Sequence, residues 1–413
     1  MPLPPGRADT YTDWLKQITM LPTAAGHERR VVAWIERWVN ERDDLTLTRD
    51  GHNNLTLAFK SPDPAATQGP IYFTAHLDHP AFVVRDCDGA SLTLEFRGGV
   101  MDDYFPDAPI IVHTDDTTRR AVITERVGDE EIPFKLFRAT LDDAGANVSP
   151  GDIATWQLPA PEVLDAPDEG PPVEGGVLFT SACDDLAAVA AALSAIEELR
   201  LTKREGKPVG DIRVLFTLAE EIGFVGAIAA CRNASIPKTA RLICLENSRS
   251  FPTDSPIGAG PIVRVGDRVS VFTPELTAAV ASVAESLAGK GAHPLAIEKQ
   301  VDSPFRWQRK LMPGGACEAS VFCAFGYSAT CVCLPLGNYH NMADLAAVQA
   351  KTNTARPRVG REHIAIRDFL GLVELLAAAG LSLPDKPSFR EKLDKLWDER
   401  RFVLEEGLTA EGR

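Results

Sequence analysis

The stretch Leu218-Ala219-Glu220-Glu221-Ile222-Gly223 follows an apolar run, Ile212–Thr217, whose composition is typical of a β-strand. A strand sends successive side chains to opposite faces, so two adjacent carboxylates at its end cannot both face a core. They are either a solvated strand end or two groups with separate functions. A lone Glu-Glu pair would favour the solvated strand end.

Four other strand-like runs are also followed by side chains that bind metals. In an open α/β sheet, ligands bind at the carboxyl ends of the strands, so residues far apart in the sequence can meet there. Together with Glu221, these residues make a ligand set for two metal ions. They are His76, Asp184, Glu246 and His340.

The composition is that of an ordinary globular protein of 413 residues and 44.7 kDa, long enough for more than one domain. The net charge of -15 argues against nucleic acid or a membrane as a partner. The amino terminus lacks the apolar core of a signal peptide, and Leu186–Ile196, the most apolar helical stretch, is too short to span a bilayer. We therefore expect a cytoplasmic protein. Its eight cysteines lack paired C-x-x-C spacing, which indicates free thiols.

The pattern of apolar residues predicts an α/β fold, a mixed sheet flanked by helices, with a small inserted β-barrel. Residues 1–80 and 176–383 form the two parts of the α/β domain, with Arg361–Leu381 expected as one long helix. Residues 81–175 form the insertion, which is also expected to join subunits. Its short alternating runs, from about Ala81 to Pro159, are separated by Gly, Asp and Pro turns and indicate a barrel or sandwich, and Pro159–Gly176 is expected to lead back to the main domain. Residues 384–413 are expected to form a charged helical tail.

The chemistry of a two-metal site assigns a role to each side chain. One carboxylate must bridge the ions, and Asp184 is the natural choice. His76 and Glu246 would then complete one site, and Glu221 and His340 the other.

Glu220 would act as the general base, and Asp78, two residues after His76, would orient that histidine. Taken singly, a histidine at a strand end is more often structural, and Asp184-Asp185 is more often a helix N-cap pair. Their joint occurrence at strand ends outweighs those interpretations.

These motifs resemble those of a known family, the dinuclear-metal aminopeptidases of the tetrahedral-assembly (glutamyl aminopeptidase) type. The resemblance extends over Tyr11–Gly380, with a further similar stretch at Gly258–Asp267 and a looser one at Gly314–Ser320. The motifs that carry it are Thr74–Asp78, Ala182–Asp185, Thr217–Ala227 and Tyr339–Asn341.

The resemblance implies a zinc-peptidase fold, with the same metal ligands, base and supporting aspartate named above. It implies two divalent ions, zinc first, with cobalt or manganese as alternatives. It also implies short peptides as substrates, and a barrel that joins subunits into a homo-oligomer, from a dimer up to a dodecamer. No nucleic-acid or membrane partner is expected.

The chain departs from the family pattern at three places. Leu186 stands where the family usually has Arg, Glu246 where it usually has Asp, and Cys317-Glu318 where it usually has Thr-Asp. These departures leave the reaction class unchanged and put the substrate in question.

Three functions are therefore compared. The first is an aminopeptidase, the second an amidohydrolase or deacylase that uses the same centre, and the third a non-catalytic peptide-binding or assembly protein. Glu220 counts against the third, because a binding module needs no general base. An aminopeptidase also needs a carboxylate for the substrate amine, and Glu318 is the first candidate, although an exposed or helix-capping role is the more common one for such a residue.

Overall fold

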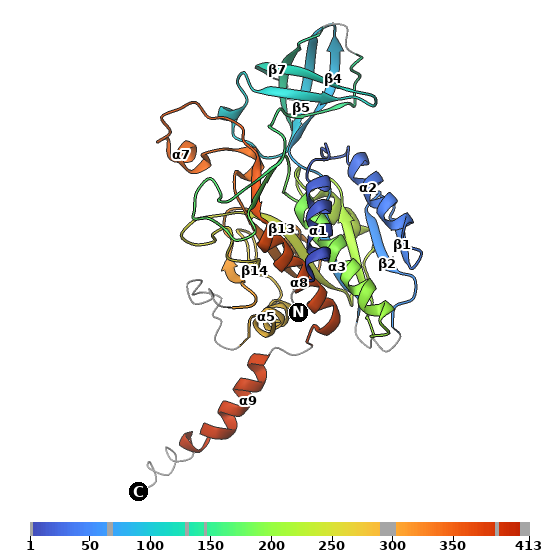
Figure 1. Ribbon diagram of the computed structural model, residues 1–413, viewed down its shortest axis with the longest axis vertical. Coiled ribbons are helices and arrows are strands. Elements are labelled where there is room, and N and C mark those ends of the chain that lie inside the picture. Colours follow the sequence, from blue (N-terminus) through green and yellow to red (C-terminus); the bar gives the residue numbers. More distant parts are fainter. Residues whose placement is uncertain are drawn as a thin grey trace.

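The computed structural model describes residues 3–63, 69–128, 132–143, 147–289, 303–384 and 388–404. Its centre is an eight-stranded mixed sheet in the order β1-β2-β12-β3-β13-β16-β14-β15 (Figure 1). The strands β12, β3, β13 and β16 are parallel, so their carboxyl ends meet at one edge of the sheet. The strand bounds are β1 (Leu45–Arg49), β2 (Leu55–Phe59), β3 (Ile71–His76), β12 (Ile212–Thr217), β13 (Arg241–Arg249), β14 (Ile262–Gly266), β15 (Gln308–Leu311) and β16 (Ser328–Leu336).

Helices cover both faces of this sheet because its strands are apolar on both sides. Along β3, for example, Ile71, Phe73 and Ala75 belong to one core, whereas Tyr72 belongs to the other. The first core contains α1 (Pro5–Ile18), α2 (Arg29–Asn40), α3 (Leu186–Arg204), α5 (Pro274–Ala288) and α8 (Ile366–Ser382). The second contains α4 (Val225–Arg232) and α6 (Glu318–Ala324).

The inserted unit is a closed antiparallel barrel in the order β4-β5-β8-β7-β6-β9, which lies at one end of the molecule (Figure 1). Its core is rich in aromatic rings, with Phe105 stacked on Phe137 at 4.2 Å between centroids. The strands are β4 (Ala81–Asp88), β5 (Ser91–Arg97), β6 (Pro109–His113), β7 (Thr118–Val127), β8 (Lys135–Leu141) and β9 (Ile153–Trp156). The predicted α/β fold with an inserted barrel is therefore confirmed.

One predicted element is wrong. Arg361–Leu381 is not a single helix, because β17 (Glu362–Ala365) precedes α8. All four residues of β17 are buried and pair with β11 (Val177–Thr180), which in turn pairs with β10 (Glu162–Leu164). The strand pairing of this buried segment outweighs the helical periodicity that continues from it.

Of the two remaining α-helices, α7 (Leu345–Ala350) contributes Leu345 and Val348 to the barrel core, and α9 (Ser388–Arg400) contributes to none of these cores within the described residues. The short helix α7 follows the last ligand strand, and α9 extends away from the rest of the chain (Figure 1). Apolar side chains of α9, such as Trp397, are exposed. Residues 405–413 of the predicted tail lie outside the described residues. No helix in the described ranges combines the length and apolarity needed to cross a bilayer.

Candidate metal centre

Strands of the central sheet and β11 of the three-stranded sheet bring together the five side chains predicted as ligands. We call them the metal centre: His76, Asp184, Glu221, Glu246 and His340. Asp184 is the one that follows β11. Asp184 lies between the two histidines. Its Oδ1 atom is 3.5 Å from Nε2 of His76, and its Oδ2 atom is 3.5 Å from Nε2 of His340. Glu221 Oε1 is 3.3 Å from the same His340 nitrogen. A carboxylate with one oxygen toward each histidine has the arrangement required of a bridging ligand.

Hydrogen bonds at the far side of each ring favour metal binding by both histidines. His76 Nδ1 lies 3.1 Å from the carbonyl oxygen of Asp78, and His340 Nδ1 lies 2.7 Å from that of Gly99. A carbonyl oxygen only accepts, so each Nδ1 carries the proton and each Nε2 keeps its lone pair. Both lone pairs therefore face the carboxylates.

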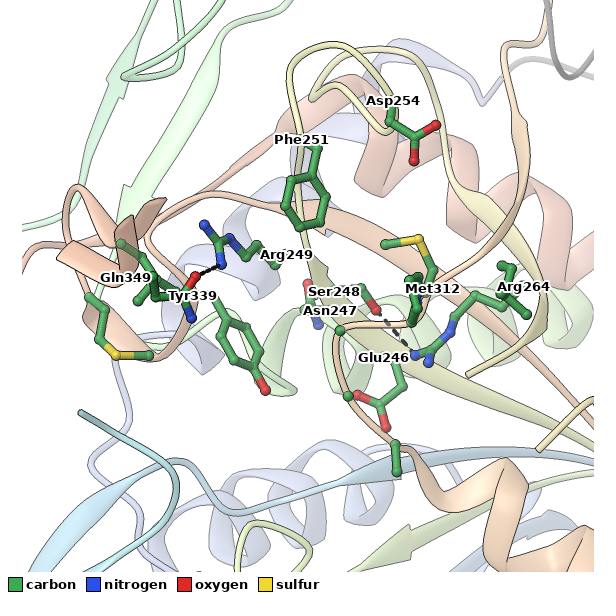
Figure 2. Close-up of a pocket in the computed structure, with 17 residues that line it drawn as sticks. Glu246, Asn247, Ser248, Arg249, Phe251, Asp254, Arg264, Met312, Tyr339 and Gln349 are labelled. Atoms are coloured by element: carbon green, nitrogen blue, oxygen red, sulfur yellow. Dashed lines mark hydrogen bonds between the residues drawn. The ribbon is translucent and has the colours of Figure 1, made fainter. Parts of the chain in front are cut away.

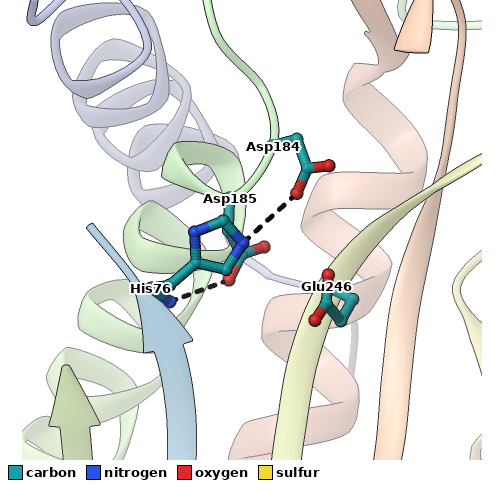
Figure 3. Close-up of side chains that lie close together, drawn as sticks. All are labelled: His76, Asp184, Asp185 and Glu246. Carbon is teal, nitrogen blue, oxygen red and sulfur yellow. Dashed lines mark hydrogen bonds and ion pairs between the residues drawn. The ribbon is translucent and has the colours of Figure 1, made fainter. Parts of the chain in front are cut away.

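The donor set fits divalent cations. His76, Asp184, Asp185 and Glu246 offer ligand atoms that all lie within 4.8 Å of one another (Figure 3), and so do Asp184, Glu221 and His340. Buried oxygen atoms of Asp184, Glu221 and Glu246 make no hydrogen bond in the structure. Buried carboxylates without partners are costly unless cations balance them, and His nitrogen with carboxylate oxygen suits zinc.

The electrostatics show the same excess of negative charge. Burial raises the pKa of Glu220 well above its ordinary value, and Glu221 raises it further. Burial likewise raises the pKa of Glu246. Burial alone would lower the pKa of His76. The negative charges of the neighbouring carboxylates, with that of Glu220 the largest, have the greater effect, so the pKa of His76 lies well above its ordinary value. Groups perturbed in this way gather at functional sites.

Side chains from three other segments hold the turn that carries Glu220 and Glu221. The backbone amides of Glu220 and Glu221 donate to the two oxygens of Asp78, at 2.9 and 3.0 Å. The preceding amide, of Ala219, donates to Glu28 at 3.0 Å, and that of Leu218 donates to Asn54 at 3.2 Å. Asp78 therefore supports the acidic turn as well as lying 3.5 Å from His76 Nδ1.

Sequence reasoning missed several supporting residues. Glu362 accepts the amides of Cys183 and Asp184 with one oxygen and that of His340 with the other. Asp185 accepts the amide of His76 at 3.2 Å and a bond from Asn247 at 2.8 Å. The doubled aspartate was a signal for Asp185, but single acids such as Glu362 carry none.

Glu318, predicted to pair with the substrate amine, begins α6 and is 2% exposed. Its Oε2 atom accepts a bond from Thr74 at 3.4 Å, and its Oε1 atom makes no hydrogen bond. Burial raises its pKa to about 7. It is therefore neither exposed nor part of the pocket described next, and its role in binding the amine stays a prediction.

A cavity of about 170 Å³, which we call the Arg264 pocket, opens beside Glu246 of the metal centre (Figure 2). Arg264 is 3% exposed, donates one 3.2 Å bond to Ser248, and has no hydrogen-bond partner at Nε. No carboxylate in the described part of the chain forms an ion pair with it. Among the other charged wall residues, Arg249 is bonded to Gln349 and Asp254 to Lys310, whereas Glu246 belongs to the metal centre.

Comparison with known proteins identifies the family. The model of the M42 glutamyl aminopeptidase family matches residues 146–356, half of the chain. The chain belongs to the M42 glutamyl aminopeptidase family. It is thus a hydrolase, a metal-dependent aminopeptidase, and the resemblance found in the motifs is confirmed. No curated protein sequence is significantly similar to it.

Solved structures share the fold of this M42 member. The TET1 peptidase of Pyrococcus horikoshii has a TM-score of 0.65 at 20% identity, over 90% of this chain and 100% of that one. A TET aminopeptidase from a marine sediment Thaumarchaeota archaeon has a TM-score of 0.66 at 19% identity, and the match covers 91% of this chain and 97% of that one. An aminopeptidase from Desulfurococcus kamchatkensis has a TM-score of 0.64 at 19% identity, and the match covers 90% of this chain and 94% of that one. At these identities the likeness establishes the fold.

Proposed function

We propose that this M42 enzyme removes N-terminal residues from short peptides at a dinuclear centre held by His76, Asp184, Glu221, Glu246 and His340. The observation that carries the proposal is the position of Asp184, with one oxygen toward each histidine. Two divalent ions, zinc first, would supply Lewis-acid polarisation of the scissile carbonyl and a water of lowered pKa.

Glu220 is the proposed general base. Its Oε2 atom lies 3.8 Å from His76 Nε2, at the edge of the ligand set. The carboxylate would take a proton from the attacking water and return it to the leaving amine, so that it ends the cycle unchanged. The bonds from the Glu220 and Glu221 amides to Asp78 hold the backbone of both residues, and Asp78 itself lies 3.5 Å from His76 Nδ1.

The Arg264 pocket is proposed to hold the side chain of the N-terminal residue. A buried guanidinium without a carboxylate partner is electrostatically unfavourable, so the pocket favours a ligand that brings a carboxylate. A guanidinium group can form two parallel hydrogen bonds in one plane, which suits the carboxylate of a glutamate or aspartate side chain. We therefore propose a preference for acidic N-terminal residues.

The deciding experiment compares a peptide with a free N-terminal glutamate and its N-acetylated twin, with both metal sites saturated. An aminopeptidase should cleave only the free form, because an acidic group that pairs with the ammonium would be left without a partner by acetylation. Equal or faster cleavage of the acetylated peptide would instead establish the deacylase alternative.

We further propose that the enzyme is a homo-oligomer joined through its barrel. The TET1 peptidase above is described as assembling into a tetrahedron or a large octahedral shell, and a related structure as a dodecamer. Light scattering at micromolar concentration tests the proposal. A monomer at that concentration would contradict it.

A further inference from the structure

The barrel touches the metal centre directly through the segment Arg97–Gly99, which leaves β5. The carbonyl oxygen of Gly99 is the acceptor for His340 Nδ1, at 2.7 Å. The bond that fixes the tautomer and ring orientation of one proposed ligand is therefore supplied by the inserted unit. Nearby, the buried hydroxyl of Tyr104 donates to the carbonyl of Ala343 at 2.7 Å, so the barrel is bonded to the chain on the far side of His340 as well.

The same segment reaches the acidic turn by a second route. Arg97 donates from a terminal nitrogen to the carbonyl oxygen of Ala25 at 2.6 Å. The next residue, Gly26, donates its amide to Glu28 Oε1 at 2.7 Å, and that oxygen also accepts the amide of Ala219 at 3.0 Å. Ala219 directly precedes Glu220. Glu28 is 4% exposed, so these bonds form away from water.

A glycine keeps the segment in place. Gly98 has φ +137°, a conformation that L side chains rarely adopt. A Cβ atom there would lie 2.6 Å from Cβ and 2.8 Å from Cα of Pro80. Pro80 follows His79, whose Nδ1 lies 2.5 Å from the carbonyl oxygen of Asp184. The loop that leaves β5 is thus in contact, beside the metal centre, with the segment that enters the barrel before β4.

We propose that Arg97–Gly99 is a positioning element of the catalytic centre, with Gly99 orienting His340 and Arg97 orienting Glu220 through Glu28. The inserted barrel would then be needed for catalysis itself as well as for assembly. This inference rests on the proposed function, because it takes His340 as a ligand and Glu220 as the base.

The first test is Gly98→Ala, which must displace the Gly99 carbonyl because Pro80 cannot yield at its backbone. We expect metal affinity and activity to fall by about 10- to 100-fold, the usual effect of losing an outer partner of a metal-binding histidine. Excess zinc should restore much of the activity. The matched control is Gly128→Ala, another barrel glycine, whose added Cβ would meet nothing within 4 Å. A folded Gly98→Ala protein with wild-type metal affinity would refute the role of Gly99.

The second test compares Arg97→Ala with Arg85→Ala. Both arginines bind the buried Glu95 at 2.7 Å, but only Arg97 also bonds to Ala25. We expect Arg97→Ala to lower kcat by about tenfold or more, with KM and two bound metal ions retained, whereas Arg85→Ala keeps the wild-type kcat. Equal kcat in the two variants would refute the role of Arg97. This test stands even if Gly98→Ala does not fold.

His340→Ala, measured in parallel, separates this inference from the function on which it rests. If His340→Ala binds as much metal as the wild type, the proposed ligand set is wrong. If His340→Ala loses metal and Gly98→Ala does not, only the positioning role of the barrel fails.

Discussion

Replacing Glu220 and Glu221 separately by glutamine separates the proposed base from the proposed ligand. Each change removes one negative charge at nearly constant shape, from adjacent residues of one turn. Glu220 lies 3.8 Å from His76 Nε2, and Glu221 lies 3.3 Å from His340 Nε2 with its oxygen otherwise without a hydrogen bond. Glu220→Gln should therefore keep the metal and lose proton transfer, whereas Glu221→Gln should lose the metal.

The expected magnitudes differ as clearly as the mechanisms. Loss of a general base lowers turnover by roughly 10² to 10⁴-fold, or about 3 to 5 kcal/mol in the barrier. A metal ion at 100 times its Kd stabilises the folded state by about 2.7 kcal/mol per site. Glu220→Gln should retain that stabilisation, and Glu221→Gln should lose it at one site.

The assay combines elemental analysis, thermal unfolding with and without a chelator, and kcat on a glutamyl peptide. We expect Glu220→Gln to contain two equivalents of metal. Adding the chelator should lower its melting temperature by as much as it does in the wild type. An active Glu220→Gln enzyme, or equal metal content in the two variants, would refute the assignment.

Three further predictions concern the pocket and the packing. Arg264→Met should lower kcat/KM for acidic N-terminal residues by about 2–5 kcal/mol, roughly 30-fold to several thousand-fold, and leave N-terminal leucine little changed, as measured on paired peptides. Burial lowers the pKa of His363 to about 4. As the pH falls, the His363 side chain is therefore protonated first in the unfolded chain. The full contribution to the free energy of unfolding is present above about pH 6.5, and up to about 3 kcal/mol of it is lost by pH 4. Denaturant titrations at both pH values should show a smaller loss in His363→Phe. Gly337→Ala would place a Cβ 2.0 Å from the His363 ring and should cost about 1–3 kcal/mol in the same titrations, unlike Gly128→Ala.

The sequence was sufficient to predict the fold class because the strands and the barrel each have a clear apolar period. Proximity of His76, Glu221, Glu246 and His340 also followed, since they lie in or after the four parallel central strands. Asp184 instead follows β11, which belongs to the separate three-stranded sheet. The roles of these residues stay predictions until metal content is measured.

The supporting shell could not be predicted in the same way. Glu28, Asn54 and Glu362 each bind backbone amides far away in the sequence, between 22 and 191 residues from their own positions. A single polar residue that satisfies such an amide leaves no periodic signal. The Arg264 pocket was missed for a related reason, since neither the burial of Arg264 nor its lack of an ion pair among the described residues can be read from the sequence.

The insertion of the barrel between β3 and β11 also has a consequence for biosynthesis. The barrel strands are contiguous in the chain, from Ala81 to Trp156, and pair only with one another. The central sheet instead needs β16, which ends at Leu336, before β13 can pair on both sides and before His340 reaches Asp184. Domains fold as units during synthesis, which starts at the N-terminus. The barrel should therefore close on the ribosome before the other proposed ligands of the metal centre can reach His76. The nascent enzyme would therefore acquire its assembly surface before it can hold metal.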